Sequence, residues 1–301
     1  MEAKSTKSTE SQLLAPELCA QLERLELVTR KIFRGRLKGE RRSKRKGQSV
    51  EFADFRNYVA GDDLRLLDWN LYARLDKLIL KLFLEEEDLH FYALVDGSLS
   101  MDFGSPSKLE YAKQLAASLA FIGLIRADRV RIETLDQAVG QRSPIFRGRQ
   151  SVWRMIRQVD AIQPRGETDL ATGVKNFCLR NPGRGVVVLI SDLMDKAGYE
   201  TALKYFVSQQ MDCFVIQVLS QEELEPDVTG DLRLVDCEDH NEAEITVSMP
   251  LLRKYRQTLN NFCTGVQQFC TKRGMNYLLA NNQVPVEELV AKHLRRRGLV
   301  R

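Results

Sequence analysis

The sequence lacks the patterns that mark zinc, disulfide-rich and membrane-spanning proteins. Its six cysteines include no C-x-x-C pair and it has only three histidines, so no zinc site is expected. No stretch approaches eighteen consecutive apolar residues, which predicts no membrane-spanning helix. The first residues are polar and carry no signal-peptide pattern. Because unpaired cysteines suit a reducing compartment, we expect a cytoplasmic protein.

The motifs of several enzyme classes are absent as well. There is no G-x-x-x-x-G-K-[ST] loop for nucleotide phosphates and no G-x-S-x-G turn to expose a nucleophilic serine. Asp96 lacks the second aspartate, two residues on, that aspartyl-phosphate phosphatases use. A metal-dependent hydrolase would supply carboxylates or histidines directly to its metal, together with a base. We therefore expect a protein without catalytic activity.

Charge is distributed unevenly along the 301 residues. The net charge is +4, but residues 1–50 carry +7 and residues 292–301 carry +5, which leaves −8 for the residues between them. The basic run RGRLKGERRSKRKG (34–47) is typical of a solvated, flexible segment and also of nucleic-acid-binding segments. Aromatic side chains for base stacking are sparse in it, which argues against nucleic acid. A third interpretation is docking on the protein's own acidic body.

The N-terminal part of the chain shows no regular alternation of strands and helices. Residues 1–14 are predicted to be a disordered tail. Residues 15–87 are predicted to be an N-terminal helical and β extension, with an amphipathic helix over 16–33 and the basic run behind it. A mixed aromatic and charged stretch follows, and the strand predicted at 77–87 ends in acidic residues.

A regular alternation of predicted strands and helices begins near His90 and predicts one large domain over 88–301. Short apolar runs such as VVVLISDL (186–193) are typical of strands buried on both faces, and amphipathic helices separate them. This alternation predicts an α/β fold with a Rossmann-like, mostly parallel sheet and helices on both faces. A β-hairpin inserted near 230–249 interrupts it.

Oxygen-bearing side chains follow the ends of the predicted strands. Asp96, Ser98 and Ser100 come directly after FYALV, Asp192 follows VVVLIS, and Thr168 precedes a predicted helix. In open parallel sheets, ligands bind beyond the carboxyl ends of strands, so these oxygens can meet. Mg²⁺ takes six oxygens, and another divalent cation such as Mn²⁺ or Ca²⁺ suits the same donors. Neutral hydroxyl ligands leave charge on the ion for an outside carboxylate, while the two aspartates hold metal-bound waters.

Each of these residues also has an ordinary structural interpretation. Asp and Ser commonly fill strand-to-helix turns, and Ser107 can cap the helix that follows it. Thr168 and Asp169 suit the N-terminus of the next helix, and Asp192 can be a turn former. The joint occurrence of oxygen donors at three strand-end positions favours the metal site.

The D-x-S-x-S motif at 96–100, with Thr168 and Asp192, resembles the metal-ion-dependent adhesion site of von Willebrand factor A domains. The order and the residue types agree, and the resemblance covers roughly 88–301. It implies a von Willebrand factor A-like fold and a metal site that binds a carboxylate of a partner protein.

A second resemblance is carried by EFADFRNYVAGDDLRLLDW (51–69), which is similar to the signature of the bacterial domain of unknown function 58 family. Members of that family join this signature to the same A-like domain. The resemblance implies an intracellular bacterial protein that works with a MoxR-type AAA+ ATPase in assembling or remodelling complexes. Two alternatives stay open: a scaffold that binds through its N-terminal segment, and a nucleic-acid-binding protein that uses its basic ends.

Overall fold

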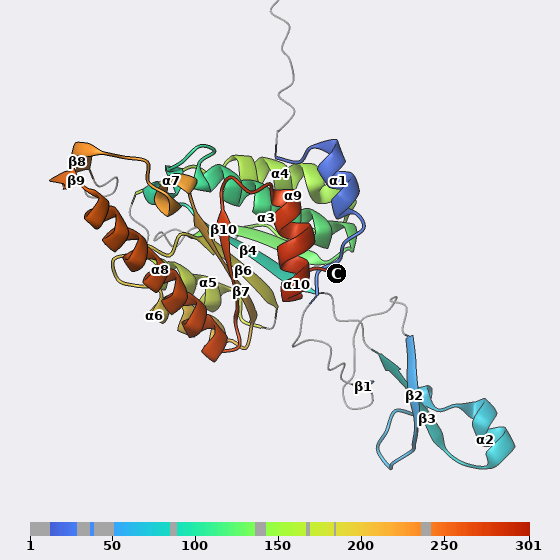
Figure 1. Ribbon diagram of the computed structural model, residues 1–301. Coiled ribbons are helices and arrows are strands. Elements are labelled where there is room, and N and C mark those ends of the chain that lie inside the picture. The colour runs from blue at the N-terminus through green and yellow to red at the C-terminus, as the bar shows by residue number, and fades with distance from the viewer. Residues whose placement is uncertain are drawn as a thin grey trace, which may run out of the picture. The chain divides into compact units, whose positions relative to one another are not determined.

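The structure is a computed structural model that describes residues 13–28, 37–38, 51–84, 89–135, 143–166, 169–183, 185–235 and 242–301. The chain forms two compact units: residues 31–88 are the smaller, and the rest of the chain is the larger (Figure 1). The predicted tail lies outside the described residues except for its last two, as does most of the basic run. The predicted extension 15–87 is divided between the two units, because α1 (Pro16–Leu22) packs on the larger one.

A five-stranded parallel sheet forms the centre of the larger unit, as the strand–helix alternation predicts. The strand order is β10-β7-β6-β4-β5, and all neighbouring strands run parallel. An isolated antiparallel bridge between Val130 and Phe146 extends the β5 edge. The strands are β4 (His90–Asp96), β5 (Arg129–Leu135), β6 (Val186–Ser191), β7 (Asp212–Leu219) and β10 (Asn276–Asn281).

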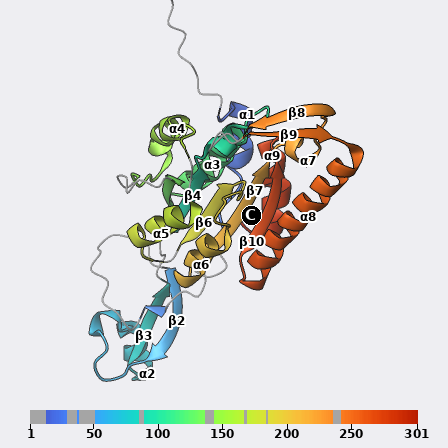
Figure 2. The ribbon, with the colours of Figure 1, turned by 90° about the vertical axis from the view of Figure 1, so that its left-hand side faces the viewer.

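Helices cover both faces of this sheet (Figure 1, Figure 2). Alternate residues of a strand point to opposite faces, so Ala93 and Val95 pack with one set of helices and Leu94 with the other. The first set is α1, α3 (Lys108–Ile125), α4 (Val152–Asp160), α9 (Val286–Glu288) and η4 (Leu289–Leu294), and the exposed α10 (Arg295–Arg297) follows η4 directly. The second set is α5 (Leu170–Arg180), α6 (Glu200–Ser208) and α8 (Met249–Lys272).

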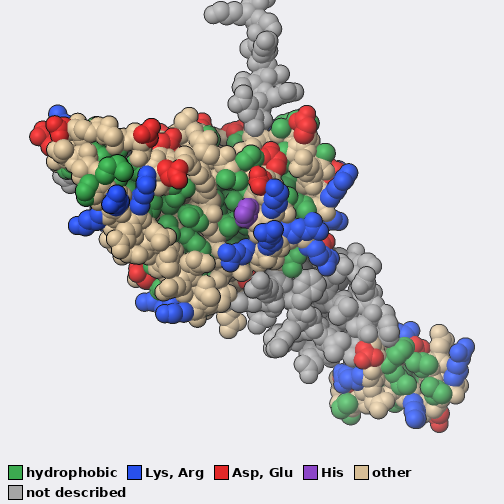
Figure 3. All heavy atoms as spheres, viewed as in Figure 1, with side chains coloured by type: hydrophobic (Ala, Val, Ile, Leu, Met, Phe, Trp, Pro, Cys, Tyr) green, Lys and Arg blue, Asp and Glu red, His purple; other side chains and the backbone are tan. Residues whose placement is uncertain are grey.

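Short elements connect these layers. The strands β8 (Gly230–Val235) and β9 (Glu242–Val247) form an antiparallel pair at the place of the predicted hairpin. Three short helices, η2 (Leu99–Asp102), η3 (Arg149–Ser151) and α7 (Gln221–Leu224), follow strand ends or precede longer helices. Figure 3 shows Lys and Arg side chains gathered over the C-terminal helical segment, where α10 consists of three arginines.

The predicted helix over 16–33 is wrong in its length, because α1 ends at Leu22. Residues beyond it pair with the other end of the chain. The amide of Val28 donates to the carbonyl of Leu299, and the backbones of Glu26 and Arg301 exchange two hydrogen bonds. The apolar spacing that predicts a helix therefore serves a short extended pairing, because a partner from the far end of the chain satisfies these backbone groups.

The smaller unit is an antiparallel three-stranded sheet in the order β1-β3-β2, with a short helix between its last two strands. Asp68 caps that helix by accepting from the amides of Asn70 and Leu71, and it pairs with Lys81 of β3 at 3.1 Å. Arg56 pairs with Asp62 at 3.0 Å. The elements are β1 (Leu37–Lys38), β2 (Glu51–Asn57), η1 (Leu64–Leu66), α2 (Trp69–Leu75) and β3 (Ile79–Leu84).

Two glycines of the larger unit make a test of this packing. A Cβ on Gly185, just before β6, would lie 2.7 Å from the carbonyl oxygen of His90, whereas a Cβ on Gly265 in α8 would meet its nearest atom at 3.5 Å. We expect Gly185→Ala to lower the free energy of unfolding by about 1–3 kcal/mol, because backbone cannot move aside cheaply. We expect Gly265→Ala to raise it by up to about 1 kcal/mol through helix propensity. Urea unfolding measures both; equal effects would contradict the strand packing.

Candidate functional site

The strand order reverses between β4 and β6, and at such a switch point open α/β sheets have a crevice beyond the carboxyl ends of their strands. From β4 the chain moves to β5 on one side, and β6, β7 and β10 then follow on the other side. Ligands of open α/β sheets bind where the strand order reverses in this way. Asp96 is the last residue of β4, and Asp192 follows the last residue of β6. The topology therefore brings these two predicted residues to the crevice.

Asp96 is a buried carboxylate held by two hydrogen bonds. Its Oδ1 accepts from the amide of Ser98 at 3.0 Å, and its Oδ2 accepts from the hydroxyl of Ser191 at 2.5 Å. Burial and the negative charge of Asp192 raise the pKa of Asp96 above its ordinary value. The site thus places two carboxylates close together in the protein interior, an arrangement that a cation stabilises.

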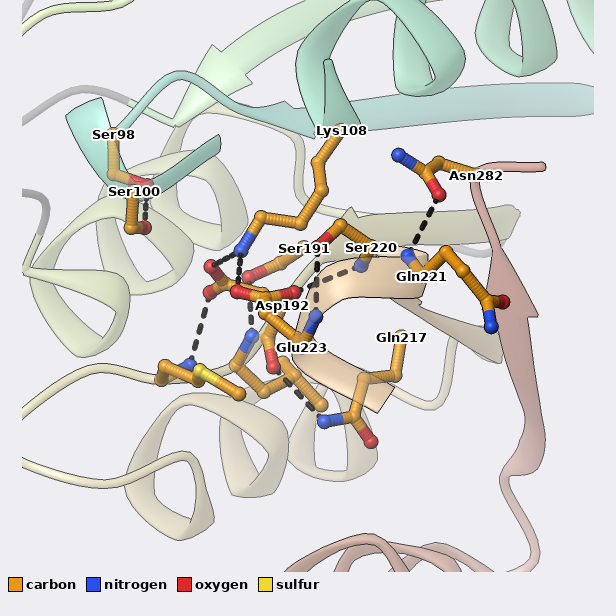
Figure 4. A network of polar contacts seen from close by, with 12 residues as sticks. Ser98, Ser100, Lys108, Ser191, Asp192, Gln217, Ser220, Gln221, Glu223 and Asn282 are labelled. Carbon is orange, nitrogen blue, oxygen red and sulfur yellow. Dashed lines mark hydrogen bonds and ion pairs between the residues drawn. The ribbon is translucent and has the colours of Figure 1, made fainter. Parts of the chain in front are cut away.

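The D-x-S-x-S loop turns its hydroxyls to one place. The Oγ atoms of Ser98 and Ser100 lie 2.9 Å apart and share a hydrogen bond (Figure 4). The loop is also tied to a neighbouring segment, because the amide of Arg165 donates to the carbonyl of Gly97 at 2.7 Å. That segment leads to Thr168, which lies outside the described residues together with Glu167.

Asp192 is bound by a buried lysine. The ammonium of Lys108 lies 2.8 Å from Oδ2 of Asp192 and 2.6 Å from Oε1 of Glu223, and the Lys108 side chain is 1% exposed. Figure 4 shows Lys108 reaching from the start of α3 onto these two carboxylates. Burial alone would lower the pKa of Lys108, but the charges of Asp192 and Glu223 outweigh it and raise this pKa. The lysine is therefore a charged part of the site.

The backbone around Asp192 is fixed by neighbouring strands. The side-chain Nε2 of Gln217 in β7 donates to the carbonyl of Asp192 at 3.0 Å, and the hydroxyl of Tyr277 in β10 donates to Oε1 of Gln217 at 2.7 Å. The amide of Met194 donates to Oδ1 of Asp192 at 3.0 Å. These contacts hold the Asp192 carboxylate in one orientation.

A further aspartate ties the loop after β6 to the start of α5. Asp195 Oδ2 accepts from the amide of Leu170 at 2.7 Å, and Asp169 caps α5 by accepting from the amide of Thr172 at 2.9 Å. Asp169 thus serves the N-terminus of α5, as its structural interpretation predicts, but as the N-cap itself, because α5 begins at Leu170 and not at 169.

The structure brings four of the five predicted residues to one end of the sheet: Asp96, Ser98, Ser100 and Asp192. Sequence reasoning missed Lys108 and Glu223, whose partners lie 84 and 115 positions away along the chain and leave no local pattern. It also missed Ser191. A signal existed there, because a polar residue ends an otherwise apolar strand directly before Asp192.

The donor set fits a hard divalent cation. Within the described ranges, no three His, Cys, Asp or Glu side chains form a cluster that could hold a metal. A metal here would need the hydroxyl oxygens of Ser98 and Ser100, which are hard donors of the kind that Mg²⁺ takes. The charged side chains are Asp96, Asp192 and Glu223 against Lys108, a formal charge of −2. One divalent ion neutralises that charge.

Ser191 offers a test of this buried network that needs no metal. We expect Ser191→Ala to lower the free energy of unfolding by about 1–3 kcal/mol, because it removes the donor to Asp96 and the acceptor of the Leu193 amide. The matched control is Ser208→Ala on the exposed side of α6, expected within about 0.5 kcal/mol of the wild type. Chemical denaturation in chelator measures both, and an equal effect would contradict the network.

Two solved structures are similar to part of the chain. One is described as conserved hypothetical protein BatB from Bacteroides thetaiotaomicron, 15% identical, covering 69% of this chain and 98% of that one with a TM-score of 0.44. The other is described as an aerotolerance-related membrane protein from Bacteroides fragilis, 18% identical, covering 69% and 99% with a TM-score of 0.42. A likeness of this degree carries no argument about function.

The predicted cytoplasmic location is contradicted by the second of these descriptions, which names a membrane protein. We therefore withdraw this prediction. The prediction rested on unpaired cysteines. Cys178 and Cys270 are buried, and burial raises the pKa of each thiol to about 12, so they are inert in any compartment and indicate none. In the part of the chain that the structure describes, no helix is long and apolar enough to cross a membrane.

Sequence comparison places the chain in a family. It is 30% identical over 247 residues to uncharacterized proteins of Mycobacterium bovis and Mycobacterium tuberculosis, covering 79% of this chain and 76% of those proteins. The family model described as protein of unknown function DUF58 matches residues 54–261. The resemblance of residues 51–69 to this bacterial family is thereby confirmed, and the chain belongs to the DUF58 family.

Proposed function

We propose that this protein is a non-enzymatic protein-binding module that depends on a divalent metal, with a von Willebrand factor A-like domain as its metal-binding part. Ser98, Ser100 and Thr168 would hold Mg²⁺, or another divalent cation such as Mn²⁺ or Ca²⁺, by their hydroxyls. Asp96 and Asp192 would hold it through bound water. The observation that carries the proposal is the pair of buried aspartates at the switch point, beside two hydroxyls that face each other.

The chemistry of these donors favours binding to an outside carboxylate. Hydroxyl ligands are neutral, so the ion keeps much of its positive charge for a ligand that comes from outside. An aspartate or glutamate of a partner protein supplies the hard, negative oxygen that such an ion prefers. The partner is therefore a protein that presents an acidic side chain.

The same contacts support a role without catalysis. Metal-assisted hydrolysis needs a base that can take a proton from a metal-bound water. The oxygens of Asp96 accept from Ser98 and Ser191, and those of Asp192 accept from Met194 and Lys108. These carboxylates are committed to positioning, which suits a binding site better than a base.

The family resemblance suggests which partner to test first. We propose that the protein works with a MoxR-type AAA+ ATPase in assembling or remodelling a complex. An acidic residue of that ATPase, or of the complex on which both act, would complete the coordination of the metal.

The experiment compares Asp96 of the motif with Asp102, which lies six residues further along the chain. We expect Asp96→Asn to weaken Mn²⁺ binding at least about tenfold in calorimetry, because it removes an acceptor that orients the metal's ligands. The control is Asp102→Asn, at the exposed end of η2, which should bind as the wild type does. Capture of the ATPase should follow the same order in Mg²⁺ and fail in chelator. Equal capture by all variants with and without metal would contradict the proposal.

A second candidate function is a scaffold that binds through the smaller unit. One observation favours it: hydrophobic side chains lie exposed on this unit (Figure 3), with Trp69 60% exposed and Val59, Leu64 and Leu75 more than half exposed. Exposed apolar side chains at this density mark interaction surfaces. The smaller unit also carries the basic side chains of Arg56, Arg65 and Lys81, and the nucleic-acid alternative stays a prediction.

A tryptophan on each unit separates the two candidate functions. If the scaffold is correct, Trp69→Ser should lower partner affinity at least about tenfold, as the loss of a binding hot spot does. Trp153→Ser, equally exposed at 66% but on α4 of the larger unit, should leave affinity unchanged. Surface plasmon resonance against the ATPase measures both. Loss of binding by Asp96→Asn with full binding by Trp69→Ser would contradict the scaffold.

A further inference from the structure

We propose that Lys108 is a built-in cation that sets the charge, and thereby the metal specificity, of the site at Asp96, Ser98, Ser100 and Asp192. It would restrict the site to one divalent ion and keep that ion open to an outside carboxylate. The inference rests on the proposed metal site and adds a residue that the D-x-S-x-S motif does not contain.

The position of Lys108 is fixed by three segments of the fold. It is the first residue of α3, directly after Ser107, whose hydroxyl and backbone amide form a capping box with Glu110. Its ammonium reaches Asp192 after β6 and Glu223 in α7 (Figure 4). Glu223 is held in turn by the hydroxyl of Tyr255 in α8, which donates to its backbone carbonyl at 2.9 Å. Lys108 therefore has a defined place beside the crevice, although it is a long side chain.

Lys108 also limits how strongly the carboxylates of Asp192 and Glu223 can bind a metal directly. One oxygen of Asp192 accepts from Lys108 and the other from the amide of Met194. One oxygen of Glu223 accepts from Lys108 and the other from the amide of Ser220 at 2.8 Å. All four oxygens thus have donors. A metal in the crevice would share each of these oxygens with a hydrogen-bond donor, which weakens the oxygen as a direct ligand and favours the hydroxyls as inner ligands.

The net charge of the site determines whether losing Lys108 strengthens or weakens metal binding. Asp96, Asp192 and Glu223 with Lys108 carry a formal charge of −2, which one divalent ion cancels. Without the ammonium the charge would be −3, and Asp192 and Glu223 would be released toward the metal. Unit charges several ångströms apart interact strongly away from bulk water. A site without Lys108 would therefore bind divalent ions more tightly, favour trivalent ions, and offer less open coordination to a partner.

Three variants of the full chain separate charge from packing. Lys108→Met keeps the length of the side chain and changes the site to −3, Glu223→Gln changes it to −1, and the double variant restores −2. We expect Lys108→Met to bind Mn²⁺ about tenfold more tightly and to gain more for Tb³⁺. We expect Glu223→Gln to bind Mn²⁺ several-fold more weakly, and the double variant to return to within about threefold of the wild type. Calorimetry with Mn²⁺ and Tb³⁺ luminescence measure these affinities.

A purely structural role for Lys108 predicts a different pattern. Loss of packing would weaken metal binding in Lys108→Met and in the double variant alike, and that result overturns the inference. If Lys108→Met does not fold, Glu223→Gln decides alone: weaker Mn²⁺ binding supports the inference and unchanged binding overturns it. If the wild type binds neither Mn²⁺ nor Tb³⁺, the proposed function itself fails and the inference with it. Wild-type binding that does not respond to these charges overturns the inference only.

Discussion

The structure around the crevice depends on how buried negative charge is compensated. The parallel sheet ends with Asp96 and Asp192 on neighbouring strands, and burial makes an uncompensated carboxylate costly. The surrounding groups stabilise these carboxylates by donating hydrogen bonds: the hydroxyl of Ser191, backbone amides of the two loops, and the ammonium of Lys108. Even so, three carboxylates, Asp96, Asp192 and Glu223, stand against one ammonium. In the function proposed above, a divalent ion would balance what remains.

The rest of the larger unit holds this arrangement in place. The contact from Tyr277 through Gln217 to the backbone at Asp192 links three adjacent strands at their carboxyl ends. Asn282, directly after β10, accepts from the amide of Gln221 and donates to the carbonyl of Pro106, so it joins α7 to the turn before α3. Glu223 and Lys108 lie on either side of that junction. The elements that carry the charges are thus braced by uncharged hydrogen bonds that need no ion.

The family match has a structural meaning. It covers residues 54–261, which begin in β2 of the smaller unit and end in α8 of the larger one. Members of the family are therefore recognised by both units together. The charge pairs of the smaller unit, such as Asp68 with Lys81, are internal to it, while several of its apolar side chains, Trp69 among them, are exposed. This pattern is typical of a unit that keeps its own shape and offers a surface for contact.

Local sequence determined the α/β class, the places of most strands and helices, and four described oxygen donors of the candidate site. Strands buried on both faces are continuous apolar runs, and amphipathic helices carry apolar residues at every third or fourth position. The carboxyl ends of parallel strands lie at the same edge of a sheet. These features can therefore be predicted from neighbouring residues. The early end of α1 and the roles of Lys108, Ser191 and Glu223 depended on the tertiary structure. Val28 leaves the helical pattern because residues of the opposite terminus satisfy its backbone, and Lys108 is charged because folding brings it two carboxylates from distant segments. Neither pairing leaves a pattern in the neighbouring sequence, because each residue meets its partner only when the chain has folded.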